Sequence, residues 1–202
     1  MSLQFPRFLR FLFSKSLIWR VPSSSKVIYL TFDDGPVPEI TPQVLDILDR
    51  YGWKATFFCV GNNVQKYPGL FDEVKSRGHV VANHTFDHLR GFWTNSDHYL
   101  NNIRKAAEYI ESDLFRPPHG QITGKQIRKL RKEFRIIMWD VITYDYDRNL
   151  SPERVLRNVT DNHRKGSIVV FHDSIKAGPN VLEVLPKAIE FWMSKGYTWN
   201  TL

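Results

Sequence analysis

The sequence of 202 residues has only one cysteine, Cys59, and no uninterrupted apolar run long enough to span a membrane. One cysteine cannot form an intrachain disulfide, and it excludes a zinc site built from several thiolates. Any bound metal ion must therefore be held by His, Asp or Glu. No Gly-x-Gly-x-x-Gly follows the first predicted strand, which disfavours a dinucleotide cofactor. Internal repeats and low-complexity tracts are also absent after residue 26.

Basic residues outnumber acidic ones by 28 to 21, which gives a net charge of +7. This balance suits contact with polyanions in general but identifies none of them. In the densest basic run, residues 125–135, Ile127, Leu130 and Phe134 recur at helical spacing, so the charges fall on a solvated helix face. No basic surface motif interleaved with aromatics accompanies the charge, and we expect no nucleic-acid partner.

The first 25 residues form a separate segment in the sequence. Arg7, Arg10 and Lys15 interrupt the apolar stretch from Phe5 to Trp19, which is too short and too charged for a transmembrane helix. No small-x-small cleavage site follows, so no signal peptide is predicted, and a cytoplasmic and a membrane-associated location at the envelope both stay open. The pattern predicts an amphipathic arm over residues 1–25 that packs on the domain or lies on a membrane surface. The residues on its apolar face are Phe5, Phe8, Leu9, Leu12 and Phe13.

From residue 26 to the end, strand-like and helix-like patterns alternate in one domain. β-Branched and aromatic runs predict strands near residues 27–32, 54–60, 79–82, 114–116, 135–139, 167–171 and 197–199. Helical periodicity lies between them, near residues 41–52, 69–77, 96–111, 125–134, 151–163 and 180–195, with Thr41 expected to cap the first helix. This alternation predicts a parallel α/β sheet, either open and doubly wound or closed into a β/α barrel.

Ionisable residues gather where the predicted strands end. The strand ends are followed by Asp33-Asp34-Gly35-Pro36, by His84 to His88, by Arg116 to Gly120, by Asp140 and Asp145, and by His172-Asp173. Because function in parallel β/α folds collects at the carboxyl ends of the strands, we expect these side chains on one rim.

The residue types on this rim suit metal-assisted hydrolysis. His84 and His88, four residues apart, can face the same way, and two histidines with one carboxylate form a common zinc ligand set. Either Asp33 or Asp34 completes that set, and the other stays free as a general base. His172 suits a general acid, and a backbone N–H in the turn 117–120 can hold a developing oxyanion. The expected substrate is an acyl group.

These segments resemble a known family. Thr31-Phe32-Asp33-Asp34-Gly35-Pro36, His84-Thr85-Phe86-Asp87-His88 and Arg116-Pro117-Pro118-His119-Gly120 are similar to the first three motifs of the polysaccharide deacetylases, carbohydrate esterase family four with its NodB-like domain. Ile168-Val169-Val170-Phe171-His172-Asp173 resembles the fifth motif. The resemblance covers residues 26–202. It implies a single-domain distorted (β/α) barrel with about seven parallel strands, one divalent metal ion, most often Zn²⁺ with Co²⁺, Ni²⁺ or Mn²⁺ as alternatives, and removal of N-acetyl or O-acetyl groups from a glycan.

The resemblance also implies roles for single residues. Asp33 corresponds to the base, and Arg116 to the residue that orients it. His172 corresponds to the acid. The backbone of His119, beside Pro118, corresponds to the oxyanion site, where the family more often has tyrosine. The implied metal ligands are Asp34, His84 and His88.

The fourth motif departs from the family pattern. In Trp139-Asp140-Val141-Ile142-Thr143-Tyr144-Asp145-Tyr146, Ile142 stands where the family has the aspartate that supports the acid histidine. Tyr146 stands in place of a tryptophan and is expected to contact substrate. Asp145 or Asp140 is expected to take over the support of His172.

Two other functions are compatible with parts of the sequence. A catalytically weak relative would bind carbohydrate through Phe92, Trp93, Tyr144 and Tyr146, although core packing suits Trp93 equally well. A phosphotransferase with an aspartyl nucleophile is disfavoured because its acids alternate as Asp-x-Asp and the two histidines would be idle. We expect an acetylated glycan as the partner and infer no protein partner; the sequence does not identify the particular glycan.

Overall fold

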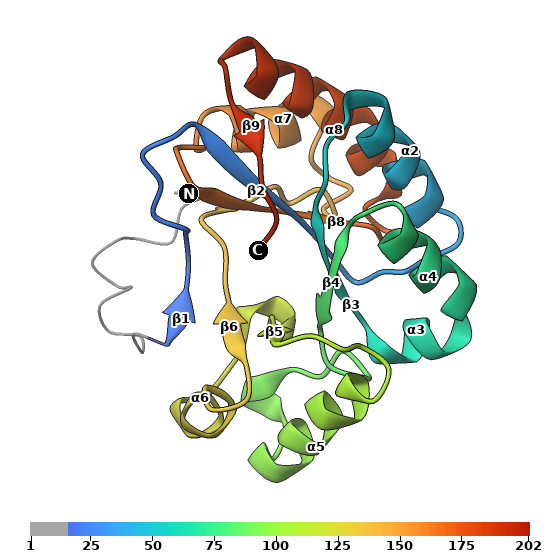
Figure 1. Ribbon diagram of the computed structural model, residues 1–202, viewed down its shortest axis with the longest axis vertical. Helices are drawn as coiled ribbons and strands as arrows, with labels where there is room; N and C mark the ends of the chain where they lie inside the picture. Colours follow the sequence, from blue (N-terminus) through green and yellow to red (C-terminus); the bar gives the residue numbers. More distant parts are fainter. Residues whose placement is uncertain (1–15) are drawn as a thin grey trace.

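Every strand among residues 16–202 runs parallel to its neighbours in one curled sheet (Figure 1). The computed structural model describes residues 16–202. In that part of the chain the sheet has nine strands, in the order β1-β6-β5-β4-β3-β2-β8-β7, and β9 also pairs with β2. The strands are β1 (Leu17–Ile18), β2 (Val27–Asp33), β3 (Thr56–Cys59), β4 (Val80–Asn83), β5 (Leu114–Phe115), β6 (Arg135–Ile137), β7 (Val141–Ile142), β8 (Ser167–His172) and β9 (Thr198–Trp199).

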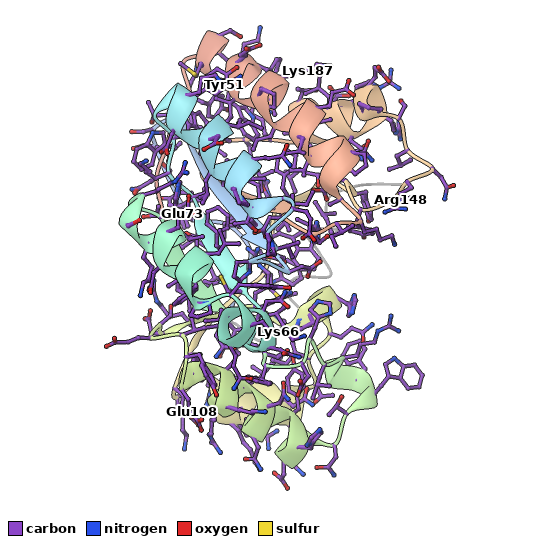
Figure 2. The ribbon with its side chains drawn as sticks, turned by 90° about the vertical axis from the view of Figure 1, so that its right-hand side faces the viewer. Tyr51, Lys66, Glu73, Glu108, Arg148 and Lys187 are labelled. Atoms are coloured by element: carbon purple, nitrogen blue, oxygen red, sulfur yellow. The ribbon has the colours of Figure 1, made fainter. Side chains whose placement is uncertain are left out.

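The helices surround this sheet, as Figure 1 shows, with α2 and α8 side by side over β2 and β8. They are α2 (Thr41–Tyr51), α3 (Gly61–Lys66), α4 (Pro68–Ser76), α5 (Ser96–Ala107), α6 (Gly124–Leu130), α7 (Pro152–Thr160) and α8 (Gly178–Ser194), with the short 3₁₀ helices η1 (Gly91–Trp93) and η2 (Pro118–Gly120). The outer faces of the helices carry charged side chains such as Lys66 and Lys187, and the exposed Glu108 follows the end of α5 (Figure 2). No helix among residues 16–202 combines the length and hydrophobicity that crossing a membrane requires.

One stretch of chain closes the curl of the sheet. The β6 part of residues 135–142 pairs with β5 and β1, whereas the β7 part pairs with β8. Between these parts the Asp140 N–H donates to the Ile168 carbonyl at 3.0 Å. The closed alternative is therefore the correct one, and the fold is a distorted β/α barrel.

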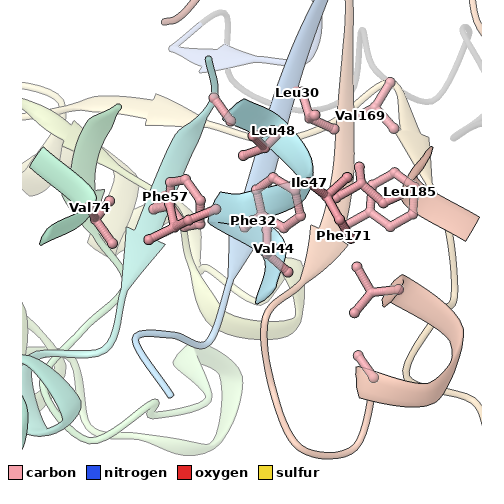
Figure 3. Packing of buried hydrophobic residues seen from close by; sticks show 14 of the residues in the cluster. Leu30, Phe32, Val44, Ile47, Leu48, Phe57, Val74, Val169, Phe171 and Leu185 are labelled. Atoms are coloured by element: carbon pink, nitrogen blue, oxygen red, sulfur yellow. The ribbon is translucent and has the colours of Figure 1, made fainter. Parts of the chain in front are cut away.

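The period of two along each strand separates an outer from an inner core. Leu30 and Phe32 of β2 pack outward with Phe171 of β8 against α2 and α8 (Figure 3). Tyr29, one residue before Leu30, packs instead with Phe58 and other residues of the barrel interior. Because side chains alternate between faces, Thr31 and Asp33 continue the inward row toward the barrel mouth.

Some boundaries differ from the sequence expectation. β1 lies inside the expected arm of residues 1–25, so the described end of that arm belongs to the sheet; the predicted apolar face from Phe5 to Phe13 lies outside the described residues. α3 was not expected, because Gly61 reads as the end of a strand. The prediction for Thr41 was also wrong: it is the first helical residue, and its hydroxyl accepts from the Val37 N–H at 2.7 Å and donates to Asp173 at 2.6 Å.

Candidate active site

The end of β2 sends two neighbouring carboxylates in different directions. Asp33 is still in the strand and points into the barrel. Asp34 has φ of 82°, so the chain leaves the strand there and the second carboxylate turns toward the mouth of the barrel. Such a backbone is unusual for any residue other than glycine. The turn therefore supplies two carboxylates to one site from consecutive positions.

A network of buried bonds holds this turn. Gly35, in a cis peptide bond with Pro36, donates its N–H to Asp173 at 3.1 Å and accepts from the Val60 N–H at 2.9 Å. A Cβ at Gly35 would lie 1.9 Å from the nearer Asp173 oxygen, so only glycine fits against that carboxylate. Asn63 binds the Asp34 carbonyl at 2.8 Å.

The segment that carries the two histidines is a turn rather than a helix. Thr85 and His88 both have positive φ, at 64° and 55°. Two buried asparagines hold the backbone in this shape: Asn83 accepts from the Thr85 N–H at 2.9 Å, and Asn102 of α5 accepts from Phe86 and Asp87 at 2.9 and 3.0 Å. As a result both imidazoles face Asp34.

Asp34, His84 and His88 bring their donor atoms within 4.8 Å of one another. Asp34 Oδ1 lies 3.1 Å from His88 Nε2 and 3.7 Å from His84 Nε2. The His84 Nδ1–H donates to the Arg116 carbonyl at 2.8 Å, which fixes the tautomer and leaves the Nε2 lone pair toward the cluster. One carboxylate and two correctly oriented imidazoles fit a divalent metal ion with an open coordination position.

The electrostatics of the cluster favour the ligand forms of these groups. Burial lowers the pKa of His84 to about 4, which keeps its imidazole neutral. Burial opposes ionisation of Asp34, but the hydrogen bond to His88 and the nearby imidazoles outweigh it, so its pKa lies below the usual value. A neutral imidazole and an ionised carboxylate are the states that bind metals.

Asp33 is excluded from this cluster by a buried arginine. Arg116 Nη1 contacts Asp33 Oδ1 at 2.5 Å and the Thr31 hydroxyl at 2.9 Å, and its Nη2 donates to the Met138 carbonyl at 3.1 Å. The guanidinium also stacks over Phe58 with its carbon 3.9 Å from the ring centroid. The other oxygen of Asp33, Oδ2, lies 3.9 Å from His84 Nε2 and thus faces the cluster without being held by Arg116.

His172 is paired with Asp145, one of the two carboxylates expected to support it. The His172 Nδ1–H donates to Asp145 Oδ1 at 2.8 Å, and the His172 backbone N–H donates to Oδ2 at 2.8 Å. The Thr143 hydroxyl also donates to Asp145 Oδ1 at 2.9 Å. Burial disfavours the charged imidazole, but the charge and hydrogen bond of Asp145 outweigh it and raise the pKa of His172 to about 9.

The other candidate support, Asp140, lies elsewhere. Its carboxylate binds Arg164 at 2.5 and 2.7 Å and the Ser167 hydroxyl at 2.9 Å. Tyr146 does reach the site, since its ring meets the ring of His172 edge-on with centroids 4.8 Å apart.

His119 sits in the η2 turn with φ of 57°, next to the buried Pro118. Its ring packs edge-on against His88 with centroids 4.8 Å apart. The Gly120 and Gln121 N–H groups bind the Pro117 and Pro118 carbonyls at 3.0 Å each. Within residues 16–202 the His119 N–H has no such acceptor, so this turn keeps one backbone donor beside the cluster.

The structure adds buried polar residues that sequence reasoning missed. Asp173 holds the Gly35 turn, and burial raises its pKa to about 8. Asn83 and Asn102 shape the histidine turn. Asp173 had one signal in the sequence, its place directly after His172. The asparagines had none, because apart from the Asp87 carboxylate that Asn102 binds, their partners are backbone groups.

A cavity of about 640 Å³ lies at the opposite, amino-terminal end of the barrel. Its lining is mostly apolar and includes Leu17, Trp19, Tyr29 and Ile137. None of the ionisable residues of the rim lines it, so its chemistry is separate from that of the rim.

The fold and the rim together define a class of protein. A parallel β/α barrel that gathers a carboxylate–histidine–histidine cluster, an arginine-held carboxylate and an aspartate-paired histidine at its mouth is a metal-dependent hydrolase. Comparison with known proteins gives the family: the polysaccharide deacetylase family model matches residues 20–136. The chain belongs to the polysaccharide deacetylase family, as its motifs predict.

Individual relatives agree with this assignment. A peptidoglycan-N-acetylglucosamine deacetylase of Bacillus cereus is 33% identical over 191 residues, which is 91% of this chain and 90% of the relative. A chitooligosaccharide deacetylase of Azorhizobium caulinodans is 32% identical over 164 residues, covering 76% of this chain and 77% of the relative. The crystal structure of the peptidoglycan N-acetylglucosamine deacetylase Bc1960 superposes with a TM-score of 0.90 at 30% identity, over 98% of this chain and 95% of that chain.

Proposed function

We propose that this enzyme removes N-acetyl groups from the amino-sugar units of a glycan such as peptidoglycan or a chitin-like oligomer. The observation that carries the proposal is the convergence of three metal-type ligands with a free carboxylate oxygen and a protonated histidine at one barrel mouth. Relatives with this substrate class cover nearly the whole chain, which supports the same class here.

Asp34, His84 and His88 would hold one divalent ion, and we propose Zn²⁺ because imidazole with carboxylate is a ligand set that zinc favours. The chemistry that such an ion supplies when bound is Lewis acidity toward the acetyl carbonyl and a lower pKa for a water molecule. Co²⁺, Ni²⁺ and Mn²⁺ accept the same donors and are included in the test below.

The proton transfers are assigned to the two paired residues. Asp33, whose Oδ1 is fixed by Arg116, takes a proton from water through Oδ2 as the water oxygen bonds to the acetyl carbon. The His119 N–H binds the oxyanion that develops on the carbonyl oxygen. His172, which is protonated at neutral pH because Asp145 raises its pKa, gives a proton to the sugar nitrogen as the carbon–nitrogen bond breaks. The products are acetate and a free amino sugar.

The alternative of a weak carbohydrate-binding relative is not favoured. A protein that only binds carbohydrate needs neither a general base nor a general acid. At this barrel mouth, however, Arg116 holds Asp33 at 2.5 Å and Asp145 holds His172 at 2.8 Å.

The test is acetate release from N-acetylglucosamine oligomers, peptidoglycan fragments and acetylated xylan, after chelation and add-back of each of the four metals. Activity on the amino-sugar polymers that is lost on chelation and restored by metal is expected. Asp33→Asn should be inactive, whereas the matched Asp72→Asn variant, changed on the exposed face of α4, should equal the wild type. Full activity in the chelated protein would contradict the proposal.

A further inference from the structure

Two adjacent aromatic side chains are exposed beside the barrel mouth. Trp93 has 80% of its surface exposed and Phe92 has 57%. Trp93 has the largest exposed fraction of the large hydrophobic side chains among residues 16–202 that stay in solvent. Core packing, the other expectation for this tryptophan, is therefore wrong. Two adjacent aromatic rings exposed to solvent form an apolar patch, and such patches mark contact surfaces.

The backbone under this aromatic pair, Phe92 and Trp93, is fixed. The Gly91 carbonyl accepts from Gln126 Nε2 at 2.9 Å, and the buried Gln126 also accepts from the Thr123 N–H at 2.8 Å. A Cβ at Gly91 would lie 2.2 Å from the Gln121 carbonyl oxygen, so η1 is seated directly on the segment that follows η2. The rings are thus presented from a rigid base next to the oxyanion turn.

The aromatic pair is close to the metal-ligand cluster along both the chain and the surface. Phe92 follows His88 by four residues, a reach of at most about 14 Å. Between them lies Arg90, whose charge acts on His119, and the His119 ring contacts the His88 ring. The aromatic pair therefore follows the metal-ligand cluster closely along the chain and lies on the side of the mouth formed by the η2 turn.

We propose that Phe92 and Trp93 form a stacking platform for the pyranose rings that lie beyond the unit being deacetylated. The inference rests on the proposed function, because the glycan enters from the mouth that these rings border. The apolar C–H face of a pyranose packs on an aromatic face, and the indole N–H can donate to a sugar hydroxyl. Such a platform needs a polymer several units long, and it gives the enzyme a preference for longer chains.

The experiment compares wild type, Trp93→Ala, Phe92→Ala and Trp93→Phe on di-N-acetylchitobiose and penta-N-acetylchitopentaose. Met193→Ala serves as the matched control, since this exposed apolar side chain lies at the far end of α8. For the pentamer we expect KM to rise roughly three- to tenfold in Trp93→Ala, with kcat unchanged and little change in Trp93→Phe. On the dimer and in the control, KM should equal the wild-type value.

The outcomes separate the two proposals. If the wild type releases no acetate from either oligomer with any metal, the proposed function fails, and the platform is then decided by fluorescence titration of the chelated protein with the pentamer. Wild-type quenching that is lost in Trp93→Ala supports the platform. Equal KM, or equal binding, for wild type and Trp93→Ala overturns it. If Trp93→Ala keeps the wild-type KM but no longer sediments with phosphatidylglycerol vesicles as the wild type does, the aromatic pair binds a membrane instead. If it keeps the wild-type KM but no longer forms a dimer that the wild type forms, the pair contacts a second copy instead.

Discussion

The pairing of His172 with Asp145 gives the sharpest prediction, because one isosteric change removes the charge and keeps the size. In Asp145→Asn, the amide oxygen can still accept from the His172 Nδ1–H, but the negative charge 2.8 Å away is gone. Burial has the largest effect on the pKa of His172 and lowers it. Because the charge of Asp145 no longer opposes burial in the variant, the pKa of His172 falls.

The size of the effect follows from the values in the metal-free protein. The pKa of His172 is about 9 with Asp145 in place, and without that charge it should fall below the ordinary value of 6.5. The difference of at least ~2.5 pH units corresponds to roughly 3 kcal/mol of coupling between the two side chains. At pH 7.5 the protonated fraction falls from about 97% to below about 9%, so kcat should drop at least ~10-fold.

The assay has two parts. Histidine NMR of the metal-free protein measures the pKa of His172 directly, and the pH profile of kcat in the metal-loaded enzyme reports the alkaline limb, which should move to lower pH in the variant. Because the folded-state pKa is raised, the pair stabilises the fold fully below about pH 6.5 and loses that contribution as pH rises through about 9. Asp147→Asn, the neighbouring carboxylate, is the control. A His172 pKa that stays near 9 in Asp145→Asn would refute the reasoning.

Three further outcomes test the rest of the site. Asp33→Asn should lower kcat by at least ~100-fold while the metal content measured by mass spectrometry stays at wild-type level; metal loss would make Asp33 a ligand. His84→Ala should lose bound metal, and wild-type metal content would remove it from the ligand set. Because burial raises the pKa of Asp173 to about 8, its ionisation destabilises the fold as pH rises from about 4 through 8, so Asp173→Asn should gain thermal stability relative to wild type over that window. A difference in melting temperature that is flat with pH would contradict this.

Much of the barrel could be predicted because apolar residues recur at regular intervals along its strands and helices. The β2 and β8 strands are apolar runs that end at Asp33 and His172, so the sequence alone predicts that these two side chains lie on one rim. β1 and β7 were not found this way, because β1 lies at the end of a stretch with the pattern of an amphipathic helix and β7 follows β6 after only three residues. α3 has buried Gly61 and Val64 but no apolar stripe, and a glycine at its start reads as a stop.

The sequence predicts which residues form the site, but it does not predict which of them contact one another. Sequence alone offered two aspartates for one ligand position, and only the backbone of Asp34 and the grip of Arg116 on Asp33 separate them in space. The same holds for Asp140 and Asp145, which differ by five positions and have unrelated partners. Long-range packing decides such choices, and it leaves no local signal.

The left-handed backbone positions have a consequence for engineering. The described non-glycine residues with positive φ all lie at the barrel mouth, His119 in η2 and the other four on loops: Asp34, Thr85, His88, His119 and Tyr144. Each such conformation costs on the order of 1 kcal/mol, which glycine would relieve at once. Selection for heat tolerance alone should therefore favour glycine at these sites, and at Asp34 and His88 that change removes a proposed metal ligand. A thermostability campaign on this scaffold has to screen turnover in every round.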